Sequence, residues 1–217
     1  GAAVVFVEPW MPIASVDHVL DAVRPKAFAT GWLGRLWGTR ARSVRAVPSW
    51  ISLGRVRPSS AQLHVESVAP SAHGVITFTS GTTGAPKGVV RTQGQLVAQH
   101  EELTRCLGLE TSTAPDLVIF ANFALANLAS GRPSVLVPPS WPASALRGLA
   151  TLPDEVRPRT LTAGPAFLAR LLDQPALPPI ESLHVGGAMT DIELHERALA
   201  AWPGVHGVHV YGSSEAE

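Results

Sequence analysis

A loop rich in hydroxyl groups and glycines, closed by one lysine, is the part of this sequence best suited to chemistry. It follows the strand-like stretch 75–78 and reads Thr79-Ser80-Gly81-Thr82-Thr83-Gly84-Ala85-Pro86-Lys87-Gly88. Glycines let the backbone adopt positive φ and approach a ligand closely, and successive N–H groups in such a loop form a nest for an anion. Because the loop's hydroxyls add donors and Lys87 adds a positive charge, the stretch predicts a polyphosphate site.

The P-loop of nucleotide triphosphatases has a different spacing. That motif is Gly-x-x-x-x-Gly-Lys-Ser/Thr. Here Gly81 and Gly84 are three residues apart, and Gly88 follows Lys87. The alternative to a phosphate site is a Gly/Thr-rich hairpin turn that binds nothing.

The elements around the loop alternate between strand and helix patterns. Such alternation predicts an α/β fold of mainly parallel sheets with helices on both faces, beginning with a βαβ unit. Ser15, the pair Thr92/Gln95 and the pair Thr190/Glu193 are predicted helix caps. The predicted strands are 2–7, 27–29, 62–65, 75–79, 116–121, 134–138, 160–163, 182–185 and 207–210, and the predicted helices are 15–23, 92–107, 124–130, 145–152, 165–172 and 190–201.

Three of the predicted strands end in residues that could bind a ligand: Ser80–Gly88, Gly186–Met189 and Tyr211–Glu215. In open α/β sheets, ligands bind outside the carboxyl ends of the strands. Two glycines after a strand indicate either a tight turn or a flat backbone ledge for a planar base. A tyrosine near a glutamate at a strand end either has a structural role or contributes to a nucleotide and metal site.

The phosphate loop resembles the signature loop of the acyl-adenylating superfamily, which includes acyl-CoA synthetases, peptide-synthetase adenylation domains and luciferase. The run Tyr211-Gly212-Ser213-Ser214-Glu215 resembles its Tyr-Gly-x-Thr-Glu motif, with Ser214 in place of threonine, and Gly186-Gly187-Ala188 resembles its adenine-binding segment. Stretches 7–9, 24–28, 31–45 and 119–125 resemble the β-lactone synthetases of that superfamily, a branch near the fatty acyl-CoA ligases. One departure is that Gln93 follows Thr92, where members often have a histidine nearby.

The resemblance implies that residues 1–217 are part of the large N-terminal domain, without the small C-terminal domain or the aspartate that holds ribose. It implies an AMP-forming ligase: ATP-dependent activation of a carboxylic acid, fatty or β-hydroxy, as an acyl-adenylate with release of pyrophosphate. The fragment alone would be inactive. The acceptor stays open between coenzyme A, a carrier thiol and the substrate's own hydroxyl.

The resemblance also assigns roles to individual residues. Lys87, Thr82 and Glu215 would be catalytic, and Glu215 would also bind Mg²⁺. Asn122, Phe123 and Gly186 would line the acyl pocket. The residues that would hold ATP are Thr79, Ser80, Gly81, Thr82, Thr83, Gly84, Lys87, Gly186, Gly187, Ala188, Tyr211, Gly212, Ser213 and Ser214.

The amino-acid composition argues against several classes of protein. The formal net charge is zero, with 16% charged and 46% hydrophobic residues, which argues against nucleic-acid binding. Cys106 is the single cysteine, so no intrachain disulfide forms. No apolar run has the length of a membrane span, and the start lacks a signal-peptide pattern, so we expect a cytoplasmic protein. A non-catalytic nucleotide-binding or interaction fragment, and a kinase-like or hydrolytic enzyme that would release ADP, are the alternative functions.

Two further features have two interpretations each. The segment 31–57 holds three tryptophans and six arginines. It is either a solvated face with arginine stems over indole rings or a basic surface for an anionic carrier or phosphopantetheine group. His100, on the apolar stripe of its predicted helix, is either a core-edge residue or a ligand to a bound group.

Overall fold

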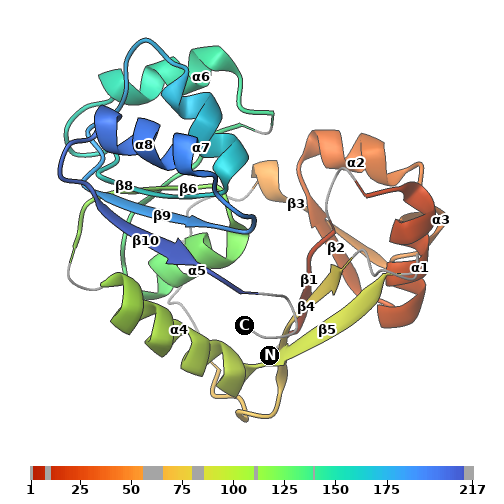
Figure 1. Cartoon of the computed structure of the whole chain (residues 1–217). Helices are drawn as coiled ribbons and strands as arrows, with labels where there is room; N and C mark the ends of the chain where they lie inside the picture. The colour runs from red at the N-terminus through yellow and green to blue at the C-terminus, as the bar shows by residue number, and fades with distance from the viewer. Residues whose placement is uncertain are drawn as a thin grey trace. The chain divides into compact units, whose positions relative to one another are not determined.

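The structure is a computed structural model and describes residues 2–7, 11–55, 66–79, 86–109, 112–138 and 140–212. The chain divides into two compact units, Gly1–Val97 and Ala98–Glu217 (Figure 1). The predicted strand 62–65 lies outside the described residues. None of the helices within the described ranges is both long and apolar enough to cross a bilayer.

The first unit contains two small sheets. In one, β1 (Val4–Val5) pairs parallel with β4 (His73–Thr79), which pairs antiparallel with β5 (Lys87–Thr92). In the other, β2 (Ala27–Thr30) pairs parallel with β3 (Ser49–Ser52). The expected βαβ unit is therefore wrong, because β1 and β2 belong to different sheets. Hydrophobic periodicity identifies strands, but it does not say which strands pair.

Helix α1 (Ile13–Val23) supplies three of the five residues in the first unit's buried cluster. Val16, Val19 and Leu20 of this helix are buried and pack with Ala41 and Val44, as the predicted stripe requires. The helix begins directly after Pro12, which occupies the N-cap position, so the prediction of Ser15 as its cap is wrong. It ends where Arg24 adopts a left-handed φ of 47°, directly before Pro25.

Polar contacts tie α1 to the short helix α3 (Arg42–Arg45). The carboxylate of Asp17 accepts hydrogen bonds from Ser43 N at 2.7 Å and Ser43 Oγ at 2.5 Å. These bonds lower the pKa of Asp17. Arg42 forms an exposed ion pair with Asp21 at 2.5 Å.

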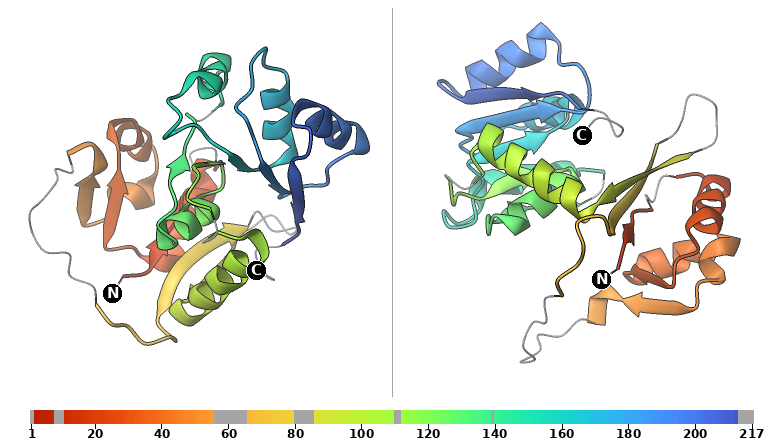
Figure 2. Two further views of the ribbon diagram at one scale, coloured as in Figure 1. Left: turned by 90° about the vertical axis from the view of Figure 1, so that its left-hand side faces the viewer. Right: turned by 90° about the horizontal axis from the view of Figure 1, so that it is seen from below.

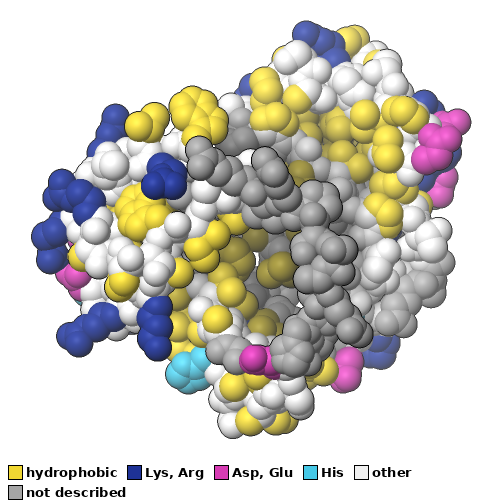
Figure 3. Space-filling view, turned by 180° about the vertical axis from the view of Figure 1, so that it is seen from behind, with side chains coloured by type: hydrophobic (Ala, Val, Ile, Leu, Met, Phe, Trp, Pro, Cys, Tyr) yellow, Lys and Arg dark blue, Asp and Glu magenta, His cyan; other side chains and the backbone are white. Residues whose placement is uncertain are grey.

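The tryptophan- and arginine-rich segment folds as α2 (Trp32–Gly38), α3, β3 and a 3₁₀ turn at Leu53–Arg55. The guanidinium of Arg35 lies 5.6 Å from the centre of the Trp50 ring, and Phe28 meets the same ring edge-on. This stacking is one contact of the kind that the first interpretation, arginine over indole, expects. Figure 3 shows basic and hydrophobic side chains side by side on one face of the molecule.

The second unit is built on one parallel sheet with the strand order β10-β9-β8-β6-β7. Helices cover both of its faces, α6 to α8 on one and α5 on the other (Figures 1 and 2). The mainly parallel α/β fold predicted from the sequence is confirmed. The strands are β6 (Asp116–Val118), β7 (Ser134–Val135), β8 (Thr160–Ala163), β9 (Ser182–Gly186) and β10 (His206–Val210). The helices are α4 (Gln93–Leu107), α5 (Ala121–Ala129), α6 (Ala143–Gly148), α7 (Pro165–Leu172) and α8 (Ile192–Ala201). Helix α4 spans the boundary between the units, and a 3₁₀ turn at Leu149–Thr151 continues α6.

The two faces of this sheet differ in chemistry. One face buries apolar side chains, among them Leu117, Leu161 and Leu183, against α6, α7 and α8. The other carries a buried polar cluster of Asp116, Asn127, Arg132, Thr160, Thr162 and His184.

The helix termini in the structure can be compared with the caps predicted from the sequence. Thr92 and Gln95 form the expected capping box: Thr92 N donates to Gln95 Oε1 at 2.9 Å, and Gln95 N donates to Thr92 Oγ1 at 3.3 Å. Helix α7 has Pro165 in its first turn, as expected. The cap of α8 is Asp191, whose carboxylate accepts from Leu194 N at 2.7 Å, so the predicted box from Thr190 is wrong.

His100 lies half-buried on α4, and its Nε2 is 3.5 Å from the hydroxyl of Ser130. No group of three or more His, Cys, Asp or Glu within the described part of the chain could hold a metal ion. The half-buried position agrees with a core-edge histidine.

Candidate functional site

The carboxyl ends of β6, β8, β9 and β10 meet at one edge of the second unit's sheet, because all of these strands run parallel. At or directly beyond these ends lie Phe120, Gly164, the segment Gly186–Ala188 and Tyr211. The tertiary structure thus brings together two of the three strand ends singled out in the sequence, Gly186–Ala188 and Tyr211. This edge is the candidate site.

Gly186 lets β9 and β10 approach closely at this edge. It is the register partner of Val210. A Cβ at position 186 would lie 2.6 Å from the Val210 carbonyl oxygen and 3.1 Å from Val210 Cβ. Real Cβ atoms essentially never come so close to backbone, so a side chain here would push the two strands apart.

Gly187 then turns the chain out of the sheet. Its φ of 82° belongs to the left-handed region that glycine adopts at little cost. Gly187 and Ala188 are both exposed. An exposed backbone segment without bulky side chains fits the flat ledge that a planar base requires.

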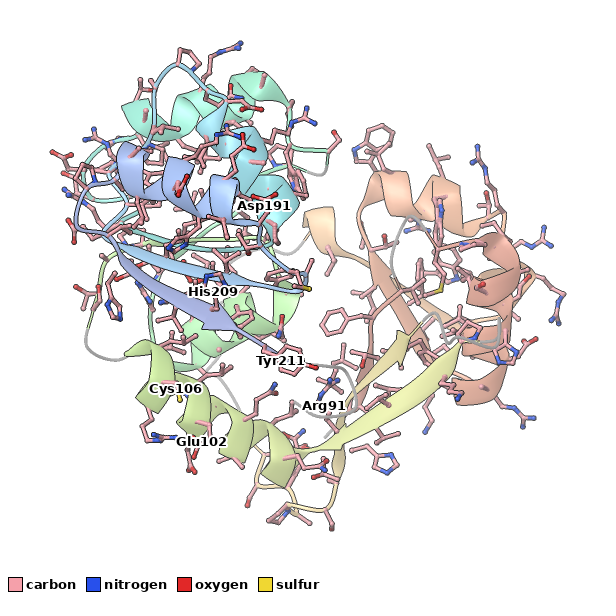
Figure 4. All side chains as sticks on the ribbon, viewed as in Figure 1. Arg91, Glu102, Cys106, Asp191, His209 and Tyr211 are labelled. Carbon is pink, nitrogen blue, oxygen red and sulfur yellow. The ribbon has the colours of Figure 1, made fainter. Side chains whose placement is uncertain are left out.

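Tyr211 stands directly beyond β10 and is 100% exposed (Figure 4). The described residues therefore leave both faces of its phenol ring open to a stacking partner. Gly212 is also exposed. The remaining residues assigned to this motif, Ser213, Ser214 and Glu215, lie outside the described residues.

Asn122 and Phe123 lie in the first turn of α5. The strand was expected to continue to Ala121 and the helix to begin at Ala124, but β6 ends at Val118 and α5 begins at Ala121. Asn122 is exposed, and Phe123 is half-buried with its ring 6.1 Å from that of Phe120.

Phe120 is a residue at this edge that the sequence did not single out. It looked like the continuation of an apolar strand, so its pattern indicated a core position. The sequence did contain a sign that the strand ends here, since the small Ala121 and the polar Asn122 follow Phe120.

The phosphate loop belongs to the first unit, where it joins β4 to β5. Thr79 and Lys87 are register partners at the loop end of this hairpin. Ser80, Gly81, Thr82, Thr83 and Gly84 lie outside the described residues. Lys87 is exposed. An antiparallel strand follows the loop, whereas a helix follows the P-loop of nucleotide triphosphatases, which agrees with the difference in spacing.

Arg91 of β5 lies on the same hairpin and donates from Nη1 to Thr77 Oγ1 at 2.8 Å. A Cβ at Gly88 would lie 3.1 Å from the Phe78 ring. The hydrogen bond from Arg91 to Thr77 thus ties β5, which begins at Lys87, to β4.

Comparisons with known proteins agree with this arrangement. The whole chain, residues 1–217, matches the family described as AMP-binding enzyme. It is 32% identical over 160 residues to an olefin β-lactone synthetase of Xanthomonas campestris pv. campestris, covering 67% of this chain and 29% of that protein. It is 27% identical over 230 residues to peramine synthetase A of Epichloe festucae, covering 99% of this chain and 8% of that protein.

Solved structures share the fold. The structure of VinN superposes with a TM-score of 0.78 at 19% identity, covering 98% of this chain and 56% of VinN. A putative long-chain-fatty-acid CoA ligase from Rhodopseudomonas palustris gives a TM-score of 0.76 at 19% identity, covering 97% of this chain and 56% of that one. The chain thus spans about half the length of these structures and less of the two relatives. It belongs to the AMP-binding enzyme family, and the predicted resemblance to the acyl-adenylating superfamily is confirmed.

Proposed function

We propose that the protein containing these residues activates a carboxylic acid with ATP, as an AMP-forming ligase. The observation that carries the proposal is the edge of the second unit's sheet. There the exposed backbone of Gly187 and Ala188 and the fully exposed ring of Tyr211 follow neighbouring strands, in a chain of the AMP-binding enzyme family. A planar base can lie on such a ledge and stack on the phenol ring.

In the proposed reaction, an oxygen of the substrate carboxylate attacks the α-phosphorus of ATP. A carboxylate O–P bond forms, the bond between the α-phosphorus and the bridging oxygen breaks, and pyrophosphate leaves with the electron pair. The protein contributes positioning and electrostatic stabilisation of the charge that develops on the phosphates.

Each group has a proposed role in this step. Lys87 and the loop residues Thr79 to Gly84 hold the β- and γ-phosphates, and Ser214 with its neighbours Gly212 and Ser213 holds the α-phosphate. Tyr211 and Gly186 to Ala188 seat adenine, while Asn122 and Phe123 line the acyl pocket. Glu215 holds Mg²⁺, which when bound neutralises phosphate charge; carboxylates together with substrate phosphates are its usual ligands.

The preferred substrate is a fatty or β-hydroxy acid, because the chain is 32% identical to an olefin β-lactone synthetase. Closure of a β-lactone by the substrate's own hydroxyl is then the second step. Transfer to a carrier thiol or to coenzyme A is the competing outcome, and the likeness to peramine synthetase A, 27% identical over 230 residues, favours the carrier.

We further propose that residues 1–217 form part of a large N-terminal domain, which a smaller domain completes. The isolated segment would then bind nucleotide but not catalyse the reaction. Cys106 is a free, exposed thiol, as is common in the reducing cytoplasm where we place the protein.

The test is carboxylate-dependent exchange of labelled pyrophosphate into ATP by the full-length protein, over a panel of fatty and β-hydroxy acids. Lys87→Ala should raise the KM for ATP and lower exchange, with little change in the KM for the acid. Lys26→Ala is the matched control, since Lys26 is the other lysine in the sequence and is exposed. Glu215→Gln should raise the Mg²⁺ concentration required.

The alternatives give different results. A kinase-like or hydrolytic enzyme would release ADP in place of AMP. A non-catalytic fragment would show no exchange, and calorimetry would show whether it binds ATP or AMP at all. Full exchange by Lys87→Ala would remove the loop from the proposed phosphate site.

A further inference from the structure

We propose that the exposed face of helix α2, in the first unit, binds the surface of an anionic lipid bilayer. The inference is independent of the proposed function, because it involves neither the nucleotide ledge nor the phosphate loop. It assigns a partner to apolar and basic side chains that the proposed reaction does not use.

The positive charge of the chain is concentrated in the stretch that contains α2. Residues 22–65 hold eight of the 17 lysines and arginines and none of the 17 aspartates and glutamates. The formal net charge of zero is therefore the sum of a basic stretch and an acidic remainder. Such a charge asymmetry is typical of a chain that binds a polyanion or a membrane surface.

Large apolar side chains stand exposed on α2 itself. Trp32 is 70% exposed, and Leu33 and Leu36 are each 62% exposed. Trp37 of the same helix packs against the buried cluster of the first unit, so α2 already has an inner face in contact with that cluster. Neighbouring apolar side chains on the outer face are typical of an interaction site.

An open groove of about 750 Å³ borders these side chains and combines apolar walls with a guanidinium group. It is lined by Trp32, Arg35, Leu36, Thr39, Pro48 and Trp50. Arg40, two residues after the helix, is exposed. Within the described part of the chain, neither Arg35 nor Arg40 forms an ion pair with a carboxylate. Both guanidinium groups can therefore bind an external anion.

A bilayer of anionic lipids satisfies both kinds of side chain at once. Its phosphate headgroups meet the arginines, and the hydrocarbon just beneath them receives the tryptophan and the leucines, as in helices that lie in the membrane interface. An acidic protein would satisfy the charges, but it would also need an apolar groove of its own for three large side chains. The combination of Trp32, Leu33 and Leu36 with unpaired arginines therefore favours the bilayer.

The test is co-sedimentation of the full-length protein with vesicles of phosphatidylcholine alone or mixed with an equal amount of phosphatidylglycerol. The wild type should bind the mixed vesicles more tightly, and added salt should weaken that binding. Burial of a leucine side chain is worth roughly tenfold or more in affinity, so Leu33→Ala should weaken binding by about that factor. Arg40→Gln should weaken it about fivefold, the contribution of one basic residue near an anionic surface.

Two matched substitutions in the second unit are the controls. Leu128→Ala removes a leucine that is 74% exposed on α5, and Arg170→Gln removes an exposed arginine of α7. Both controls should bind the mixed vesicles as the wild type does. Circular dichroism compares the folding of all four variants, each of which replaces an exposed side chain.

Several results would overturn the proposal. They are a wild type that sediments with neither kind of vesicle or equally with both, and unchanged binding in Leu33→Ala and Arg40→Gln. Binding to soluble polyglutamate but not to vesicles would assign the face to an acidic protein instead of a bilayer. None of these measurements uses ATP or an acid substrate, so a failure of the proposed function would leave their outcome unaffected.

Discussion

The hydroxyl of Thr162 lies 3.1 Å from Nδ1 of His184 and, on its other side, donates to the Asp116 carboxylate, 3.1 Å from each oxygen. A threonine hydroxyl has one hydrogen. Because that hydrogen goes to Asp116, the histidine must donate from Nδ1 to the Thr162 hydroxyl. Asp116 also accepts from Asn127 Nδ2 at 2.9 Å. The chain of hydrogen bonds lies on the polar face of the sheet, and all of these residues are at most 2% exposed.

Thr162→Val should destabilise the second unit by about 2–3 kcal/mol, since it keeps the side-chain shape but leaves the buried imidazole N–H without its hydroxyl partner and removes one of the donors to the buried Asp116 carboxylate. Denaturant unfolding followed by circular dichroism measures the loss. Thr151→Val is the control, because the Thr151 hydroxyl donates to the Gly148 carbonyl at an exposed turn. Equal losses in both variants would contradict a stabilising role for the buried chain.

Stability should fall in mild acid because of His184. Burial, as the largest cause, lowers the pKa of His184 to about 4, with the Arg132 and His206 charges acting in the same direction and Asp116 opposing them. In the unfolded chain a histidine titrates near 6.5. Between these values the unfolded state binds the proton and the folded state does not, so the free energy of unfolding decreases as pH drops from about 6.5 towards 4, by up to about 3 kcal/mol.

The measurement is the free energy of unfolding against pH for wild type, His184→Asn and His209→Gln. His184→Asn should lose this part of the slope. His209 is exposed, so its replacement should retain the slope. A wild-type slope in the His184 variant would assign the acid sensitivity to other groups.

Gly186→Ala should disturb the candidate site more than Gly207→Ala, the matched change in β10. Its Cβ would meet the Val210 carbonyl oxygen at 2.6 Å, so β9 and β10 must separate at the end that carries Tyr211. We expect a loss of about 1–3 kcal/mol in stability, the range for overpacking, and a raised KM for ATP. Gly207→Ala on β10 is the matched control, since a Cβ there meets nothing within 4 Å. Similar KM values for the two variants would argue against the ledge.

Asp191→Ala should cost about 1 kcal/mol, the usual effect of removing a helix cap, because its carboxylate accepts from Leu194 N. Thr190→Ala should cost less, since the Thr190 hydroxyl is buried without a hydrogen-bond partner among the described residues. Thermal unfolding of the two variants compares them directly. A larger loss in Thr190→Ala would restore the capping box predicted from the sequence.

Local features of this protein were readable from its sequence. The Thr92/Gln95 box, the strand Thr160–Ala163 and the helix that starts at Pro165 all depend on residues within one helical turn or one strand of each other. The spacing of the glycines and Lys87, and the residues at the strand ends, were enough to indicate the superfamily. These signals are short-range, so no tertiary contact was needed to read them.

Tertiary structure alone decided which elements meet. It paired β2 with β3 rather than with β1, and it assigned the cap of α8 to Asp191. It also brought the Phe120 ring to Gly187, although the two are 67 positions apart in the sequence. Strand pairing and ring packing depend on groups distant along the chain, and neither hydrophobic period nor capping pattern carries that information.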